Sequence, residues 1–261
     1  MATGGHVKAL LNLGLHDPNI IGRPNVVTTL MEDTSGPWME YFAHKEARDQ
    51  QGQFMADAYL SLIKGRTIIA EAPTGLGKTA ASLASALAAM KQSENVKKIL
   101  FLTGRQSQHK IVIDTVRKLN DNRKDHPNVA IVDLIGRESM CGKLTIDRQC
   151  FCEEGVSEKA RGGRRSQLKR WILEWPRHVE ETVKNGRKEG TCPYMCCIEA
   201  AREAEIIVMD YNHVFVESVS DSSLPSMSID VGSSIVIVDE AHNLPDRIKM
   251  GLEMRLTSKT V

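Results

Sequence analysis

The feature that most constrains this chain is a glycine-containing segment at residues 72–79, which reads Ala-Pro-Thr-Gly-Leu-Gly-Lys-Thr. An apolar run at 66–70 precedes it and an Ala- and Leu-rich stretch follows it, so the segment joins a strand to a helix. Glycines let backbone N–H groups wrap a phosphate, and the helix N-terminus faces the anion. Lys78 would reach the β- and γ-phosphates and Thr79 would bind Mg²⁺. The sequence therefore predicts a nucleotide phosphate loop formed by Thr74, Gly75, Gly77, Lys78 and Thr79.

A second motif, Asp239-Glu240-Ala241-His242, follows the apolar run 235–238. In open parallel sheets, ligands bind at the carboxyl ends of the strands, where this motif is predicted to lie. Asp239 would hold Mg²⁺, and Glu240 would orient and deprotonate an attacking water. A helix N-cap with acidic first-turn residues is the alternative interpretation. Downstream of a phosphate loop, the motif favours a nucleotide hydrolase.

Runs of β-branched residues alternate with helical patterns along most of the chain. The expected strands lie at 66–70, 99–103, 129–134, 206–209 and 235–238. The expected helices lie at 78–91 and 108–119, and an earlier one places Phe54, Ala58, Leu62 and Ile63 on one face. Strands that alternate with helices form βαβ units, so we expect an α/β fold with a parallel sheet and helices on both of its faces.

Composition sets only broad limits. The chain has 261 residues, 41% of them hydrophobic and 26% charged, with a net charge of +1, so any nucleic-acid surface must be local. No run approaches the roughly 18 apolar residues of a membrane helix, which predicts that the chain has no membrane partner. The first residues also lack a signal-peptide cleavage site, which predicts a reducing compartment.

All six cysteines fall within residues 141–197. In a reducing compartment, such a group indicates a metal site more than disulfides. The spacing contains no Cys-x-x-Cys pair, so the usual zinc-ribbon pattern fails. Zinc and an iron–sulfur cluster both take four thiolates, and the residues alone do not separate them.

A basic run at 161–171 lies between the cysteines and contains no acidic residue. Arg164 and Arg165 would neutralise phosphates of DNA, and Trp171 and Trp175 would stack on unpaired bases. The spacing of the two tryptophans equally fits a helix that packs its apolar face on the protein interior, and we favour that interpretation for them.

Several short motifs occur in one order along residues 48–261. They are Arg48-x-x-Gln51, Thr103-Gly-Arg-Gln-Ser-Gln108, Gly136-Arg137, Cys192-Pro-Tyr194, Asp210-Tyr-Asn212 and the Asp-Glu-Ala-His motif followed by Asn-Leu. Together with the phosphate loop, they resemble the XPD-type iron–sulfur DNA helicases of superfamily 2, which include the DinG-like proteins. The resemblance implies a RecA-like motor domain interrupted by a cysteine-rich, mostly helical iron–sulfur insertion.

The resemblance also implies the roles of individual residues. ATP, Mg²⁺ and a [4Fe–4S] cluster would be the cofactors. Gln51 would read the adenine, His242 would join the nucleotide site, and Arg105 and Gln108 would contact DNA. The implied cluster ligands are Cys141, Cys150, Cys152 and Cys192. Cys196 and Cys197 are expected to be buried structural residues, although either could replace Cys150 or Cys152.

The activity implied by the resemblance is ATP-dependent unwinding of DNA with 5′→3′ polarity in DNA repair. Single-stranded and fork-like DNA would be the partners of a monomer, together with proteins of a repair complex. The compartment would be the nucleus of a eukaryote, or the cytoplasm and nucleoid of a prokaryote.

We expect an N-terminal extension at 1–46, a motor domain at 47–136 and 196–248, the cluster insertion at 137–195, and at 249–261 the start of an arch domain. The arch and a second motor domain would be absent from this chain. The alternative function is therefore a truncated module that binds ATP and DNA but has no helicase activity of its own.

Overall fold

The structure, a computed structural model, describes residues 7–13, 35–72, 75–141 and 152–252. Its centre is a six-stranded sheet with the strand order β2-β1-β6-β3-β5-β4. The strands are β1 (Val7–Leu13), β2 (Ile68–Ala72), β3 (Lys98–Leu102), β4 (Ile131–Asp133), β5 (Ile206–Met209) and β6 (Ser234–Val238). The pairs β6-β3, β3-β5 and β5-β4 are parallel, which confirms the predicted parallel sheet in this part of the molecule.

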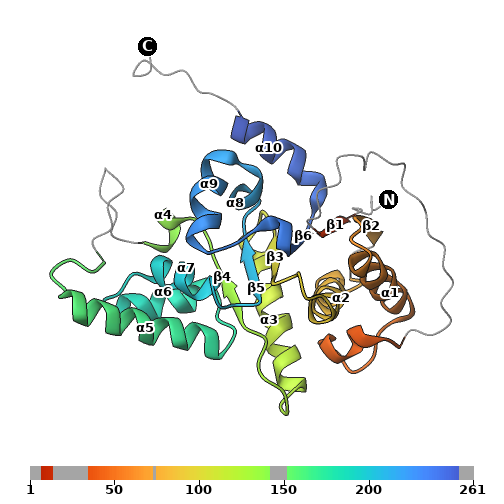
Figure 1. Cartoon of the computed structure of the whole chain (residues 1–261), viewed down its shortest axis with the longest axis horizontal. Coiled ribbons are helices and arrows are strands. Elements are labelled where there is room, and N and C mark those ends of the chain that lie inside the picture. The colour runs from red at the N-terminus through yellow and green to blue at the C-terminus, as the bar shows by residue number, and fades with distance from the viewer. Residues whose placement is uncertain (1–6, 14–34, 73–74, 142–151, 253–261) are drawn as a thin grey trace, which may run out of the picture.

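Helices cover both faces of the sheet (Figure 1). The longer ones are α1 (Asp49–Ile63), α2 (Lys78–Gln92), α3 (Gln106–Asn122), α5 (Glu158–Glu174), α6 (Val179–Lys188), α7 (Pro193–Ala201), α9 (Glu217–Ser226) and α10 (Leu244–Leu252). The short ones are α4 (Arg137–Met140), α8 (Asn212–Phe215), and the 3₁₀ turns η1 (Pro37–Tyr41), η2 (Val231–Ser233) and η3 (Ala241–Asn243). Within the described residues, none of the helices has the length and hydropathy needed to cross a membrane.

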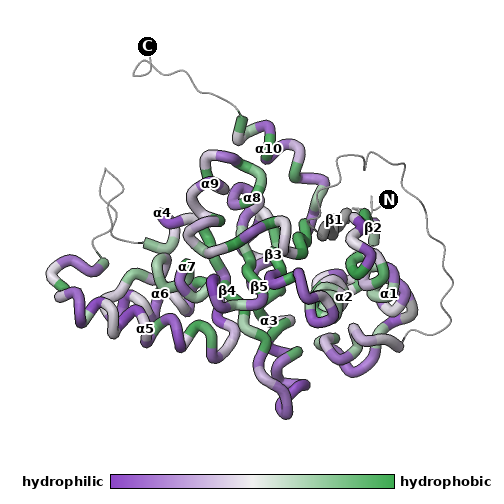
Figure 2. Tube along the Cα trace, in the orientation of Figure 1, coloured by the Kyte–Doolittle hydropathy of each residue, from purple (hydrophilic) through white to green (hydrophobic). Residues whose placement is uncertain are grey.

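The alternation of side chains along the strands divides the interior into two cores. Ile99 and Phe101 of β3 pack with α1, α2 and α3 in the first core. Leu100 and Leu102 of the same strand pack with α5, α7 and α8 in the second core. Figure 2 shows the hydrophobic residues concentrated in these central strands. Both faces of the central sheet are therefore buried, as expected of a parallel sheet between two helical layers.

Strand β2 differs from the predicted buried strand at 66–70. It begins two residues later, at Ile68, and lies at the edge of the sheet. Ile69 is 66% exposed, and Ile63, which the sequence placed on one helical face with Leu62, is 42% exposed, so neither belongs to the core. An edge strand has only one neighbouring strand in the sheet. This position explains why Ile69 is exposed although the apolar run around it indicated a buried strand.

The N-terminal segment, for which the sequence indicated no role, contributes to the fold. Strand β1 pairs antiparallel with both β2 and β6 and so lies between them. Further on, η1 packs against α2, and the ring of Trp38 lies 5.3 Å from that of Tyr59 on α1. The described parts of residues 1–46 are therefore joined to the sheet and to the first core.

The helices of the cysteine-rich segment pack on the second core. Leu168 and Ile172 of α5 and Val179 of α6 are buried in the same cluster as Leu100 of β3. Trp171 also packs on this cluster, and the guanidinium of Arg177 lies 4.1 Å from the centre of its ring. The segment therefore shares its apolar interior with the sheet domain.

Candidate nucleotide site and cysteine-rich segment

The phosphate loop joins β2 to α2, as the sequence predicted. Gly75 and Gly77 have φ angles of +89° and +80°, which L-residues with side chains rarely adopt. Gly77 is the N-cap of α2, so Lys78 and Thr79 form the first turn of that helix. Thr74 lies outside the described residues. This backbone places the N–H groups of a helix N-terminus where a phosphate would bind.

Lys78 lies between the loop and the acidic motif. Its Nζ donates to the carbonyl of Ala72 at 3.2 Å, at the end of β2. Its charge also acts on the carboxyl of Asp239, where it opposes the rise in pKa caused by burial. The two groups that the sequence assigned to the phosphates and to Mg²⁺ are therefore close enough to interact electrostatically.

Arg48 and Gln51 lie against the phosphate loop from the start of α1. The Nη1 of Arg48 donates to the carbonyl of Gly75 at 2.5 Å. The Oε1 of the buried Gln51 accepts from the N–H of Arg48 at 3.1 Å and caps the helix. A side chain at Gly77 would place its Cβ 2.3 Å from the Nε2 of Gln51. The motif Arg48-x-x-Gln51 thus supports the loop directly.

The acidic motif begins where β6 ends. The N–H of Asp239 donates to the carbonyl of Leu102 at 2.9 Å, which ties the motif to β3. Burial, followed by the charge of Glu240, raises the pKa of Asp239 to about 6. Glu240 has a φ of +52°, and the Nδ1 of His242 lies 3.5 Å from its Oε2. A buried carboxylate beside a second one favours binding of a cation.

Tyr211 is a residue near this site to which the sequence assigned no chemical role. Its side chain is 1% exposed, and its hydroxyl donates to the carbonyl of Asp239. Burial, followed by the charge of Asp239, raises the pKa of Tyr211 to about 12, so the phenol stays protonated at neutral pH. The motif Asp210-Tyr-Asn212 was recognisable in the sequence, but its contact with residues 28 positions later was not.

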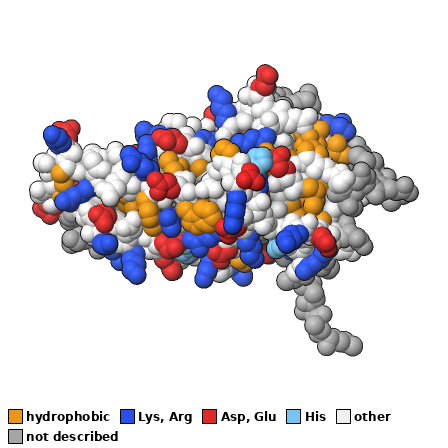
Figure 3. All heavy atoms as spheres, turned by 90° about the horizontal axis from the view of Figure 1, so that it is seen from below, with side chains coloured by type: hydrophobic (Ala, Val, Ile, Leu, Met, Phe, Trp, Pro, Cys, Tyr) orange, Lys and Arg blue, Asp and Glu red, His pale blue; other side chains and the backbone are white. Residues whose placement is uncertain are grey.

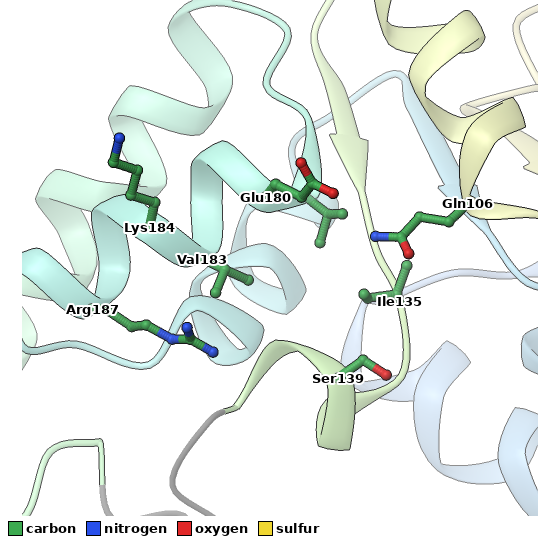
Figure 4. A pocket seen from close by; sticks show the side chains of 8 residues that line it. Gln106, Ile135, Ser139, Glu180, Val183, Lys184 and Arg187 are labelled. Atoms are coloured by element: carbon green, nitrogen blue, oxygen red, sulfur yellow. The ribbon is translucent and has the colours of Figure 1, made fainter.

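The two residues predicted to contact DNA from the segment after β3 lie at the start of α3. Arg105 is exposed and is the N-cap of α3, and Gln108 is half-buried in its first turn. Nearby, a cavity of about 360 Å³ lies between the starts of α3 and α4 and the helix α6. Figure 4 shows Gln106 and Arg187 on opposite sides of this cavity. Lys184 and Arg187, which line it, were not singled out from the sequence.

Three of the four predicted cluster ligands lie in the described residues, and Cys150 does not. The Sγ atoms of Cys141 and Cys152 are 3.2 Å apart. Cys192 is buried at the start of α7, and its N–H donates at 3.2 Å to Glu153, the neighbour of Cys152. The described residues contain no group of three or more His, Cys, Asp or Glu side chains arranged to hold a metal ion.

Cys196 and Cys197 occupy the next turn of α7 and are buried. The Sγ of Cys197 lies 3.8 Å from the carbonyl of Asp133 at the end of β4. Burial raises the pKa of the Cys196 thiol to about 12, and burial also raises the pKa of the Cys197 thiol well above its ordinary value. Both residues are therefore buried as expected, and their structural role remains a prediction.

Glu153 joins the segments that carry the cysteines. It is 8% exposed and accepts from Arg165 Nε at 2.8 Å and from the hydroxyl of Thr191 at 2.8 Å. Burial acts to raise its pKa, but these bonds and the one from Cys192 outweigh it and lower the pKa to about 2. Glu153 is therefore ionised and holds α5 against the N-terminus of α7.

Arg165 was predicted to contact DNA, and its internal partners do not favour that role. Its guanidinium binds Glu153 and also lies 3.6 Å from Glu199. Arg164 is exposed, and its Nη1 lies 3.5 Å from the carbonyl of Gly190. On the face drawn in Figure 3, Lys and Arg side chains are interspersed with Asp and Glu. DNA contact by Arg164 and Arg165 therefore remains a prediction.

Comparison with known proteins agrees with this arrangement. The family model DEAD_2 matches residues 101–261, and the DEAD/DEAH box helicase model matches residues 49–144. Regulator of telomere elongation helicase 1 of Rattus norvegicus is 32% identical over 123 residues, which cover 47% of this chain and 9% of that protein. The XPD helicase subunit of general transcription and DNA repair factor IIH of Dictyostelium discoideum is 22% identical over 245 residues, 84% of this chain and 31% of that protein. The chain thus spans less than a third of the length of these relatives.

A solved structure named XPD_Helicase has the same fold. It aligns with a TM-score of 0.52 and 22% identity over 79% of this chain and 34% of the other. The sheet and the loop between β2 and α2 define the class of protein, a RecA-like nucleotide-binding domain of the helicase type. Within this class, the chain belongs to the DEAD_2 family of XPD-type superfamily-2 helicases.

Proposed function

We propose that this chain is the ATP-binding motor part of an ATP-dependent DNA helicase that acts in DNA repair. The observation that carries the proposal is the position of Lys78, whose Nζ donates to the end of β2 and whose charge acts on Asp239. The loop and the acidic motif follow strands of one sheet, and ligands bind at the carboxyl ends of such strands. Membership of a helicase family and the similarity to the two helicases named above support the same activity.

Each residue of the site has a distinct task in ATP hydrolysis. The N–H groups from Gly75 to Thr79 and the Nζ of Lys78 would bind the β- and γ-phosphates. Gln51 would bind the adenine, and His242 would contact the nucleotide beside Glu240. The carboxylate of Glu240 would orient the attacking water and accept its proton.

Thr79 and Asp239 fit a Mg²⁺ ion. The fit is indicated by the carboxylate of Asp239, which is buried next to a second carboxylate and has a raised pKa. When bound, Mg²⁺ would neutralise charge on the phosphate oxygens. Asp239 would hold the ion from the end of β6, and the hydroxyl of Thr79 would hold it from the first turn of α2.

The proposed ligands of a [4Fe–4S] cluster are Cys141, Cys150, Cys152 and Cys192. Two observations support this choice: the thiols of Cys141 and Cys152 lie together, and the N–H of Cys192 donates to Glu153, the neighbour of Cys152. When bound, the cluster would cross-link segments that are far apart in the sequence. Glu153 would keep Cys192 in position in either state.

We propose that Arg105 and Gln108 contact single-stranded DNA, since Arg105 is exposed at the start of α3. Arg164 is a further candidate, and the proposed polarity is 5′→3′. Fork-like DNA and proteins of a repair complex would be the partners of a monomer. The place of action would be the nucleus in a eukaryote and the nucleoid in a prokaryote.

The variant Glu240→Gln tests this function because it separates binding from hydrolysis. We expect it to bind ATP like the unmodified chain, while any DNA-stimulated ATP hydrolysis falls by about 10²- to 10⁴-fold. The exposed Glu217→Gln on α9 is the control and should change neither quantity. Loss of binding and hydrolysis together would show that Glu240 is structural. Binding of ATP and DNA by the unmodified chain without turnover would favour the module that lacks helicase activity of its own.

A further inference from the structure

Three segments meet at one edge of the sheet, where the neighbouring strands β5, β3 and β6 end. The first carries Tyr211, the second carries Gly104 and Arg105, and the third carries Asp239 and Glu240. Backbone bonds tie them beyond the strands themselves. The N–H of Thr103 donates to Met209 at 3.1 Å, and the N–H of Asp239 donates to Leu102 at 2.9 Å. A displacement of one of these segments would therefore also displace the other two.

The hydroxyl of Tyr211 lies between the second and third segments. It donates to the carbonyl of Asp239 and lies 3.5 Å from that of Glu240. On its other side, the ring of Tyr211 packs against the backbone of Gly104. A Cβ at position 104 would lie 3.0 Å from the Cε2 of Tyr211, so only glycine lets the backbone come this close without displacing the ring.

The backbone of Glu240 depends on such support. Its φ of +52° is in the left-handed region, which is unfavourable for a residue with a side chain and persists only where neighbours hold it. Its carbonyl accepts from the N–H of Asn243 at 2.9 Å and from the Nδ2 at 3.3 Å. Tyr211 holds the peptide on the other side. The direction of the Glu240 carboxylate is therefore set in part by the phenol.

We infer that Tyr211 is a positioning residue that couples DNA binding at Arg105 to the position of the peptide between Asp239 and Glu240, and through Asp239 to the binding of nucleotide with Mg²⁺. The inference rests on the proposed function, since it requires both ligands to bind. Movement of Gly104 when the neighbouring Arg105 contacts a phosphate would be passed through the ring and then the hydroxyl of Tyr211 to the peptide between Asp239 and Glu240. Tyr211 itself touches neither ligand.

The coupling is measured as the ratio of the nucleotide affinity with DNA bound to the nucleotide affinity without DNA. A fluorescent non-hydrolysable ATP analogue with Mg²⁺ is titrated into the chain with and without a saturating single-stranded oligonucleotide. Linkage requires the effect of DNA on nucleotide affinity to equal the effect of nucleotide on DNA affinity, and we expect about 5-fold or more in the unmodified chain. In Tyr211→Phe, which keeps the ring and removes the hydrogen bonds of the hydroxyl to the carbonyls of Asp239 and Glu240, we expect the ratio to fall to about one.

Two further variants make this test specific. Gly104→Ala pushes on the same ring from the other side and should also reduce the ratio. Two controls change residues away from this site. Tyr59→Phe removes the hydroxyl that donates to Gln92 in the first core. Gly163→Ala adds a methyl group in open space on α5. Both controls should keep the ratio of the unmodified chain.

The possible outcomes separate the inference from the proposed function. Failure of the unmodified chain to bind the analogue would overturn the function and the inference with it. Binding of both ligands with an unchanged ratio in Tyr211→Phe would overturn the inference alone. A role of Tyr211 in folding only would weaken both affinities together and leave their ratio unchanged, which would also overturn it.

Discussion

The candidate nucleotide site and the cysteine-rich segment hold their functional groups in different ways. In the nucleotide site, the strand ends of one sheet fix the groups, and hydrogen bonds from Arg48, Lys78 and Tyr211 hold the backbone carbonyls of the loop and the acidic motif. In the cysteine-rich segment, the cysteines come from separate stretches, and one buried carboxylate, Glu153, connects two of these to α5. The first site is therefore built by the fold, and the second depends on side-chain contacts.

This difference predicts how each site responds to substitution of its side chains. A change in a side chain of the nucleotide site should affect its ligand but leave the sheet intact, because the backbone geometry comes from the strands. A change in the cysteine-rich segment should affect the packing of α5 and α7, because these helices share the second core. The predictions below test this contrast.

The largest effect is expected for Lys78→Ala. Removing a charged donor to phosphate should weaken nucleotide binding by about 10- to 100-fold, which corresponds to the roughly 1.5–3 kcal/mol of such a hydrogen bond, and should abolish hydrolysis. Equilibrium titration with a fluorescent ATP analogue measures the affinity. Lys91→Ala at the other end of α2, which loses only its pair with Glu205, is the control. Unchanged binding in Lys78→Ala would mean that the loop does not bind phosphates.

The next effect is expected for Cys192→Ser. Protein purified without oxygen should contain about four irons per chain, and the variant should lose them because a cluster of this type takes four thiolates. Cys197→Ser, one turn further along α7, should keep its iron. ATP binding should remain in both variants, since the nucleotide site contains no cysteine. Stoichiometric zinc and no iron in the unmodified chain would contradict the cluster assignment.

The smallest effect is expected for Glu153→Gln. Removing the charge of Glu153 leaves Arg165 with only the more distant Glu199 and should destabilise the chain by about 3 kcal/mol in chemical denaturation. The double variant Glu153→Gln with Arg165→Met should lose less than the sum of the two single changes. Lys169→Met, which removes a more exposed pair with Glu203, should cost under about 1 kcal/mol. Equal losses in Glu153→Gln and Lys169→Met would show that Glu153 does not hold the segment together.

The parts that the sequence predicted are those in which neighbouring residues determine the structure. Strand β5 has the predicted bounds, and α2 differs from the predicted helix by one residue at its end. A β-branched run favours a strand at its own position, and the glycines before α2 fix where that helix begins. Strand β1 was missed because its place depends on pairing with β2 and β6, which follow much later in the chain. The exposure of Ile69 was missed for the same reason, since only the order of strands puts it at an edge.

The candidate sites show the same limit. The glycines and Lys78 were recognisable from spacing alone, whereas the contact of Tyr211 with Asp239 depends on how β5 and β6 are arranged around β3. Arg165 lies in a run without acidic residues, which indicated a free basic surface. Its partner, Glu153, comes from outside that run and reaches it only when α5 folds against the start of α7.

The most direct test of the account is the dependence of ATP binding on Mg²⁺. Titration of the unmodified chain with a fluorescent ATP analogue should give saturable binding that strengthens when Mg²⁺ is added. In Asp239→Asn, binding without Mg²⁺ should be at least as tight as in the unmodified chain, because a carboxylate near the phosphates is gone, and the gain from Mg²⁺ should be lost. Absence of binding to the unmodified chain in the presence of Mg²⁺, or the same gain from Mg²⁺ in Asp239→Asn, would contradict the account.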